Sequence, residues 1–258
     1  MASLLRARGL HTVCTGARCP NLAECWARGT ATVMILGNTC TRGCAFCAVD
    51  RHPAPPLPDP GEPRRVAELA KELSLAYVVI TSVTRDDLPD GGASQFVATV
   101  SEVRRLCPDS RIELLIPDLR GDALEAVASS GADVVGHNLE TVRRLTPLVR
   151  HPRASYEASL AVLAELAAHG VQAKTALLLG LGETEAEVEE ALLDAYTRGV
   201  RRVAMGQYLA PSRNHARVQR YWTPQEFEEL AALARSIGYT WVASGPLVRS
   251  SYHAEAGI

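Results

Sequence analysis

Short apolar runs alternate with longer segments whose apolar residues recur at helical spacing, from residue 33 almost to the end of the chain. Brief apolar runs bounded by turn residues are typical of buried strands, and a repeat of three to four residues is typical of amphipathic helices. The pattern predicts six strands, at 33–37, 77–82, 111–116, 133–137, 174–180 and 202–208. It predicts a helix after each strand, at 64–75, 93–106, 121–130, 155–169, 184–199 and 224–237.

Strands that alternate with helices in this way indicate an α/β fold with a parallel sheet, and the 258 residues suit a single barrel. The proline-rich segment 52–63 predicts an extended connector, because proline lacks the N–H that helices and central strands need. Residues 239–245 form either a further strand or an extended tail. We therefore expect three parts: a segment 1–32, a barrel 33–238 and a tail 239–258.

Six of the seven cysteines lie between residues 14 and 47. No apolar run reaches the length of a membrane span and no secretory signal is evident, so we expect a cytoplasmic protein with reduced thiols. An odd number of cysteines in a reducing compartment argues against a disulfide framework and favours metal or redox chemistry. Cys107, at the end of a predicted helix, is expected to be structural.

The clustered cysteines form two triplets, Cys14, Cys19 and Cys25, then Cys40, Cys44 and Cys47. Structural zinc normally takes four ligands, often as two pairs, and fits this spacing badly. Three thiolates on a four-iron, four-sulfur cluster leave one iron open to another ligand. The second triplet follows the first predicted strand, where active sites of parallel barrels lie. One structural zinc or cluster that draws on both triplets is the alternative.

The formal net charge of −2, with acidic and basic residues interspersed, does not indicate a nucleic-acid or membrane surface. A small molecule, or a protein that carries one, is the expected partner.

Cys40-x3-Cys44-x2-Cys47, with Phe46 before the last cysteine, resembles the signature of the radical S-adenosylmethionine superfamily. The chain also resembles the lipoyl synthase family over nearly its whole length, in CTGARCPNLAECW, ITSVTRDDLPDGGA, HNLETVRRL, LLLGLGETEAEV, GQYLAPSRNHARVQRYWTPQEF and ASGPLVRSSYHAE. The resemblance implies a partial (β/α)6 barrel with N-terminal and C-terminal extensions that carry a second cluster. It also implies two 4Fe-4S clusters and S-adenosylmethionine as cofactors.

In this family, the equivalents of Cys40, Cys44 and Cys47 would hold the cluster that binds and cleaves S-adenosylmethionine, which yields a 5'-deoxyadenosyl radical. Cys14, Cys19 and Cys25 would hold the second cluster with a serine of the Arg249–Tyr252 motif, assigned to Ser251 with Ser250 as its neighbour. The second cluster would donate two sulfur atoms to C6 and C8 of an octanoyl chain on a lysine of a lipoyl-carrier protein. A low-potential donor of the ferredoxin or flavodoxin type would supply electrons.

Further polar and glycine residues at or just after the ends of predicted strands, and Lys174 at the start of one, are expected to bind the cofactor: Asn138, Glu140, Lys174, Gly180, Gly182, Glu183, Gln207 and Tyr208. Each has a structural alternative. Asn138 and Glu140 suit a turn, the Gly-x-Gly pair a tight loop, Lys174 an ion pair and Tyr208 core packing.

Asp86, Asp87, Gly91 and Gly92 resemble a stretch near the methionine amino group in the superfamily, or form a plain turn. His137 is expected to be a hydrogen-bonded structural residue.

Two rival functions are a different two-cluster sulfur-inserting enzyme, such as a methylthiotransferase, and a non-enzymatic electron carrier. The lack of a basic patch argues against a nucleic-acid substrate. Six β/α units are more than a small electron carrier needs.

Overall fold

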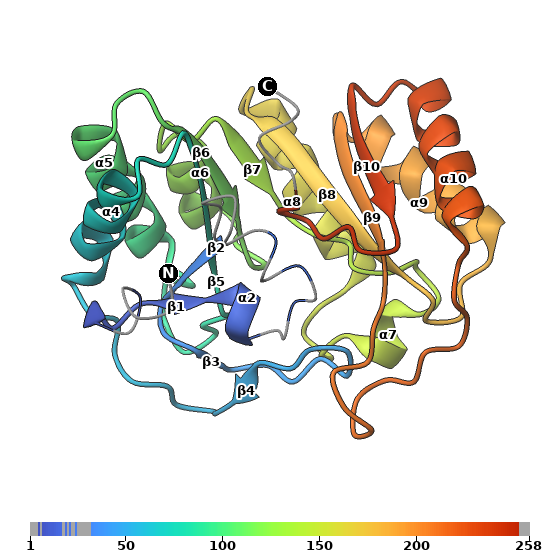
Figure 1. Cartoon of the computed structure of the whole chain (residues 1–258), viewed down its shortest axis with the longest axis horizontal. Helices are drawn as coiled ribbons and strands as arrows, with labels where there is room; N and C mark the ends of the chain where they lie inside the picture. The colour runs from blue at the N-terminus through green and yellow to red at the C-terminus, as the bar shows by residue number, and fades with distance from the viewer. Residues whose placement is uncertain are drawn as a thin grey trace. The chain divides into compact units, whose positions relative to one another are not determined.

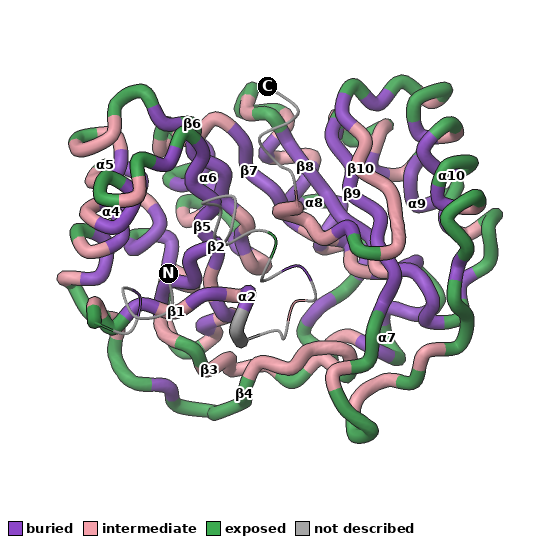
Figure 2. The backbone as a smooth tube through the Cα atoms, in the orientation of Figure 1, coloured by how far each residue is buried: buried purple, intermediate pink, exposed green. Residues whose placement is uncertain are grey.

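The computed structural model describes residues 5, 7–16, 19, 21, 24 and 32–252. The chain forms two compact units, Met1–Gly43 with Ala48–Val135, and Cys44–Cys47 with Gly136–Ile258. The strands of both units are largely buried (Figure 2). The expected division of the chain into three functional parts, at residues 32 and 238, stays a prediction.

The first unit contains a parallel sheet in the order β1-β2-β5-β6, with β1 antiparallel at its edge. Its elements are β1 (His11–Thr12), α2 (Val13–Gly16), β2 (Thr32–Ile35), β3 (Thr39–Cys40), β4 (Asp50–Arg51), α4 (Glu62–Glu72), β5 (Tyr77–Ser82), α5 (Ala93–Leu106), β6 (Arg111–Leu115) and α6 (Asp122–Ala128). α5 packs against both α4 and α6 (Figure 1). Ile80 of β5 is in register with Val33 of β2 and Leu114 of β6, and all three side chains are buried.

Helix α4 begins inside the proline-rich segment that the sequence predicted to be fully extended. Pro63 occupies the first turn of the helix, where a missing N–H costs nothing. Glu62 is buried, and its carboxylate accepts the backbone N–H of Leu36 at 2.8 Å and the amide of Gln95 at 2.9 Å. The start of α4 therefore supports the chain that leaves β2.

The second unit contains the parallel strands β8-β9-β10. Its elements are α7 (Thr146–Val149), α8 (Tyr156–Ala168), β8 (Gln172–Leu179), α9 (Glu185–Thr197), β9 (Arg202–Gln207), α10 (Pro224–Ile237) and β10 (Trp241–Gly245). β7 (Val134–Gly136) lies at the point in the sequence where the first unit ends. α9 packs against α8 and α10, and α9 and α10 both begin with a capping box, at Thr184 and Thr223.

The C-terminal tail packs on one side of β8, β9 and β10. Alternate residues of a strand face opposite sides of a sheet, so Ala176 and Ala204 face the side that Val248 covers. At Gly206 the approach is closest, since a β-carbon there would lie 1.9 Å from the carbonyl oxygen of Val248. The tail segment that leads to Ser251 therefore requires glycine at residue 206.

Each of the six predicted strands and six predicted helices is present, with bounds that differ by at most three residues. Residues 241–245 form strand β10, which decides between the two alternatives for this stretch. Among the described residues, the sequence pattern missed five short elements, β1, α2, β3, β4 and α7, because two to four residues are too few to show a period.

Candidate functional site

In the first unit, Cys40 ends strand β3, which pairs with β4. The backbone N–H of Arg42 donates to the sulfur of Cys40 at 3.3 Å, and the carbonyl of Cys40 accepts the N–H of His52 at 3.0 Å. The thiolate is the form of cysteine that binds metal. Cys40 is thus held on both its backbone and its side chain.

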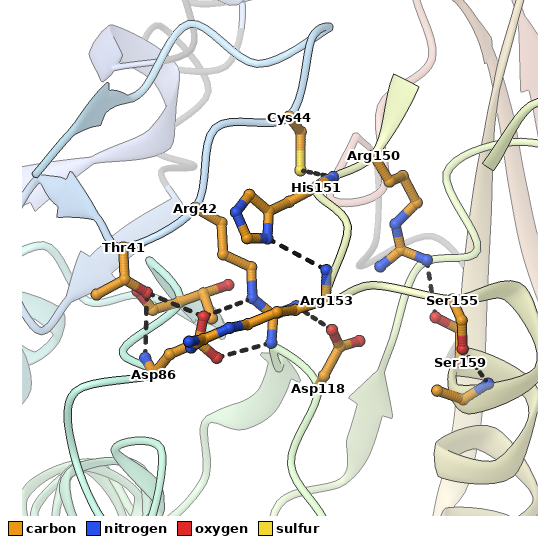
Figure 3. A network of polar contacts seen from close by, with 12 residues as sticks. Thr41, Arg42, Cys44, Asp86, Asp118, Arg150, His151, Arg153, Ser155 and Ser159 are labelled. Atoms are coloured by element: carbon orange, nitrogen blue, oxygen red, sulfur yellow. Dashed lines mark hydrogen bonds and ion pairs between the residues drawn. The ribbon is translucent and has the colours of Figure 1, made fainter. Parts of the chain in front are cut away.

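Arg42, two residues after Cys40, connects the cysteine segment, which begins at Cys40, to residues that follow β5 and β6. Its Nε and Nη2 each donate to Asp86 at 2.8 Å, and Nη1 pairs with Asp118 (Figure 3). Burial alone would lower the pKa of Arg42, but hydrogen bonds to Asp86 and Asp118 raise it, so the guanidinium stays charged. This interaction also fixes Asp86, one of the residues considered at the cofactor.

The remaining predicted positions of the first unit have structural partners. Arg85 is buried and pairs with Asp87 through Nε at 2.8 Å and Nη2 at 2.7 Å. Gly91 and Gly92 have φ values of +60° and +92°, and a β-carbon at Gly92 would lie 2.2 Å from Leu36. These glycines provide a tight turn into α5.

In the second unit, hydrogen bonds to its backbone and to one of its thiols hold the segment Cys44–Cys47 in place. The N–H of His151 donates to the sulfur of Cys44 at 3.3 Å (Figure 3). Ala45 donates to the carbonyl of Val149 at 2.8 Å and accepts from the N–H of Ala216 at 2.7 Å. Four-residue α7 ends at Val149, so this short helix places the acceptor for Ala45.

Asn138 and Glu140 follow β7 and point toward each other, with the Asn138 amide 3.1 Å from Oε1 of Glu140. Glu140 has a φ of +68°, which is unfavourable for a side chain other than glycine. Its backbone bonds hold it there, donating to Ala176 at 3.0 Å and accepting from Leu178 at 2.7 Å. Backbone strain of this kind clusters at functional sites, and the Glu140 side chain is partly exposed.

Glu183 is buried and binds the protein's own N–H groups. Oε1 accepts from Gly180 and from the indole of Trp222, the latter at 2.9 Å, and Oε2 accepts from Leu181 at 2.9 Å. Gly180 and Gly182 have φ values of +104° and +110°, and a β-carbon at Gly180 would lie 2.1 Å from Gln207. The expected Gly-x-Gly loop is therefore a tight loop closed by Glu183.

Gln207 and Tyr208 are buried and also bind the chain itself. The side-chain amide of Gln207 donates to the backbone carbonyl of Arg220 at 3.0 Å, and its oxygen accepts the backbone N–H of Trp222 at 2.9 Å. The Tyr208 hydroxyl donates to Ala216 at 2.9 Å. Burial, together with negative charge on Cys47, raises the pKa of Tyr208 to about 12, so this hydroxyl remains a donor at neutral pH.

Lys174 lies at the beginning of β8, in register with Arg202 of β9. It is 2% exposed, and its Nζ lies 4.5 Å from the ring centre of Trp241. The Arg202 guanidinium lies 5.1 Å from the same ring. This cation–π arrangement stands at the opposite end of the strand from Gly180.

His137 is buried and its Nε2 lies 2.9 Å from the Ser159 hydroxyl, as a structural residue should. Cys107 caps α5.

The first cysteine triplet is described in part. Cys14 is buried, and its N–H donates to Thr12 at 2.9 Å, while its carbonyl accepts from Cys19 at 3.0 Å. Cys25 lies outside the described residues. Ser250 and Ser251 are partly exposed in the C-terminal tail, where Tyr252 donates to the carbonyl of Arg249 at 3.0 Å.

Sequence reasoning missed four residues that hold the second cysteine triplet: Arg42, Asp118, His151 and His215. Two of them gave a signal: Arg42 lies between two of the cysteines, and His215 lies in one of the segments that resemble the family.

The fold resembles those of several proteins of known structure. The FeFe-hydrogenase maturase HydG from Carboxydothermus hydrogenoformans superposes with a TM-score of 0.67 at 17% identity, over 82% of this chain and 52% of that one. Streptococcus suis SuiB bound to S-adenosylmethionine gives 0.64 at 11% identity, over 86% of this chain and 53% of that one. The chain spans about half of each, and the likeness confirms the predicted partial barrel.

Residues 34–195 match the Radical SAM superfamily. Lipoyl synthase from Myxococcus xanthus is 51% identical over 256 residues, 98% of this chain and 86% of that protein. The enzyme of the same name from Methylococcus capsulatus is 54% identical over 257 residues, 98% of this chain and 79% of that protein. The chain belongs to the lipoyl synthase family. Members of this family use S-adenosylmethionine and 4Fe-4S clusters.

The thiols fit the clusters of the family in their chemistry. None of the six described cysteines is in a disulfide, and the thiols of Cys40 and Cys44 each accept a backbone N–H. In the described part of the chain, no three His, Cys, Asp or Glu side chains are already grouped as a metal site. The cysteines therefore fit the clusters through their sulfur donors and through their spacing in the sequence.

Among the described residues, no helix has both the length and the apolar character to cross a membrane.

Proposed function

We propose that this chain is a lipoyl synthase that inserts two sulfur atoms at C6 and C8 of an octanoyl group on a protein lysine. The observation that carries the proposal is 51% identity to a lipoyl synthase over 98% of the chain. That length includes both cysteine triplets and the tail with Ser251.

Cys40, Cys44 and Cys47 are our proposed ligands of the cluster that binds S-adenosylmethionine. Cys14, Cys19, Cys25 and Ser251 are the proposed ligands of the second cluster. An alcohol oxygen is a harder and weaker ligand for iron than a thiolate, so Ser251 suits a cluster that gives up its sulfur. When bound, these groups and S-adenosylmethionine supply the hydrogen-abstracting radical and the sulfur.

The chain's own residues orient these groups. Arg42 holds one part of the cysteine segment through Asp86 and Asp118, and the N–H of His151 holds Cys44. Asn138 and Glu140 remain the cofactor contacts that geometry supports best, because both are partly exposed beside the end of β7. The bonds of Glu183, Gln207 and Tyr208 favour supporting roles, as does the position of Lys174 at the start of its strand.

Lipoyl synthases act on lipoyl-carrier proteins, and radical S-adenosylmethionine enzymes need a reductant. We propose an octanoylated lipoyl-carrier domain as the substrate and a ferredoxin or flavodoxin as the reductant, both in the cytoplasm.

Anaerobic reconstitution tests the proposal. The loaded protein should hold about eight irons per chain, as two four-iron clusters require. With S-adenosylmethionine and a reductant, an octanoyl-lysine peptide should gain two sulfur atoms, detected by mass spectrometry together with 5'-deoxyadenosine. Deoxyadenosine without sulfur transfer would contradict a lipoyl synthase and leave only the superfamily assignment. An absence of cofactor cleavage would favour the electron carrier.

A further inference from the structure

The segment Cys44–Cys47 is bound by a loop that lies far away in the sequence, between β9 and α10. The N–H of Ala216 donates to the carbonyl of Ala45 at 2.7 Å. Next to it, Nε2 of His215 lies 3.1 Å from the carbonyl oxygen of Cys47. This carbonyl belongs to the residue that we propose as a cluster ligand.

The partners of His215 determine which ring nitrogen carries the proton. A carbonyl oxygen can only accept, so Nε2 is the donor to Cys47. Nδ1 lies 2.8 Å from the hydroxyl of Ser212, which donates to it in the neutral ring. The Ser212 oxygen in turn accepts the backbone N–H of Asn214 at 3.2 Å. A chain of hydrogen bonds thus runs from the loop backbone to Cys47.

The second half of this loop, from Ala216 to Trp222, is anchored to residues at the ends of β8 and β9. The Tyr208 hydroxyl donates to Ala216 at 2.9 Å, and the N–H of Gln219 donates to Gly180 at 2.8 Å. Gln207 also holds Arg220 and Trp222. His215 is therefore presented to Cys47 from a fixed position, with its ring partly buried.

We propose that His215 is a positioning residue for Cys47, acting through the Cys47 carbonyl and making no bond to iron. The hydrogen bond fixes the peptide that follows the Cys47 α-carbon, and so restricts where its thiolate points. Residues that orient metal ligands in this way typically contribute about 10-fold to 100-fold in metal affinity or activity. The inference rests on the proposed function, because it needs Cys47 to be a ligand.

Four variants separate the hydrogen bond from packing. His215→Ala removes both bonds of the ring. Gln and Asn differ by one methylene, so His215→Gln keeps an amide donor near the position of Nε2, whereas His215→Asn places it near Nδ1. His169→Ala is the matched control, because His169 is an exposed residue at the end of α8.

Two readouts follow the cluster without relying on turnover. One is the rate at which the reconstituted protein loses iron to a chelator. The other is the electron paramagnetic resonance spectrum of the reduced cluster before and after S-adenosylmethionine is added. We expect His215→Ala and His215→Asn to lose iron from one cluster about 10-fold to 100-fold faster, with an altered spectrum. His215→Gln should stay within a few-fold of the unchanged protein.

Equal iron loss and equal spectra for the Ala, Asn and control variants would overturn the inference. So would Gln and Asn variants that behave alike, because a packing role does not distinguish them. If Cys47→Ala does not lower the iron content at all, the proposed function fails instead. Should His215→Ala fail to fold, the Gln and Asn pair still decides.

Discussion

The indole N–H of Trp222 donates to the carboxylate of Glu183 at 2.9 Å, and both side chains are buried. The same carboxylate accepts the backbone N–H groups of Gly180 and Leu181. One side chain thereby joins the loop after β8 to the residue before the cap of α10. A buried carboxylate bound by three donors of its own chain indicates a structural role.

Glu183→Ala should lower the free energy of unfolding of the second unit by about 3 kcal/mol, because buried donors lose their acceptor. Glu183→Gln should cost less, since one oxygen remains. Chemical denaturation of the cluster-free protein measures both. Glu189→Ala is the control, on the exposed side of α9. A Glu183→Ala protein as stable as this control, but with weaker S-adenosylmethionine binding, would restore the cofactor role.

Arg42→Ala should leave Asp86 and Asp118 without their shared cation. The Arg42 and Asp118 side chains are only 9% and 3% exposed, so the expected loss is about 3 to 5 kcal/mol. The iron content should fall as well, because the cysteine segment loses its attachment to the residues that follow β5 and β6. Denaturation midpoints and iron counts test this.

Arg64→Ala is the control for Arg42. Arg64 is 72% exposed and pairs with Glu68 one turn away, so its loss should change stability by about 0.5 kcal/mol or less. Similar behaviour of the two variants would mean that the Arg42 interaction contributes little.

Glu187 makes the free energy of unfolding depend on pH in the acidic range. Hydrogen bonds from Arg144 and from Thr184 lower its pKa from 4.5 to about 2. A carboxylate with a lowered folded pKa stabilises the protein above its unfolded pKa, and this contribution is lost as the pH falls toward the folded value. The free energy of unfolding should therefore decrease from about pH 4.5 to about pH 2 in part through Glu187.

Denaturation across this pH range, compared between the unchanged protein and Glu187→Gln, isolates the effect. The Gln variant should show a shallower acid dependence, and Glu189→Gln should not. Parallel pH curves for all three proteins would rule out this role.

The sequence pattern was sufficient for the larger elements because their signals are local. Alternating apolar runs, and glycine or capping residues at their ends, depend on a few neighbouring residues. Thr184 and Thr223, for example, cap α9 and α10 through Glu187 and Glu226, each three residues away.

The contacts of the site depend on residues that the fold brings together. Asp118 lies 76 residues from Arg42, and His215 lies 168 residues from Cys47. No spacing rule links such pairs. Because no such rule exists, the sequence could not show that polar residues at strand ends bind their own chain, and they were expected at the cofactor. Sequence position placed Gln207 and Glu183 at strand ends, but only the structure gives their acceptors and donors within the chain.

Gly206 and Gly245 are opposite one another on β9 and β10, and they differ in the space around them. A β-carbon at Gly245 would lie 3.4 Å from a methyl of Val248, an ordinary contact, whereas at Gly206 it would meet the Val248 backbone. Gly206→Ala should therefore displace the tail and Gly245→Ala should not. Trypsin cleavage after Arg249, followed by mass spectrometry, should accelerate roughly tenfold for each 1.4 kcal/mol of tail destabilisation. Equal cleavage of both variants would refute the clash.

This difference matters for anyone who engineers the protein for heat resistance. Replacing strand glycines with alanine is a common stabilising substitution, since it restricts the unfolded chain. At residue 206 the added methyl group would push aside the polypeptide that carries Ser251. A library screened for melting temperature alone would not reveal this cost, so such a screen should keep residue 206 fixed.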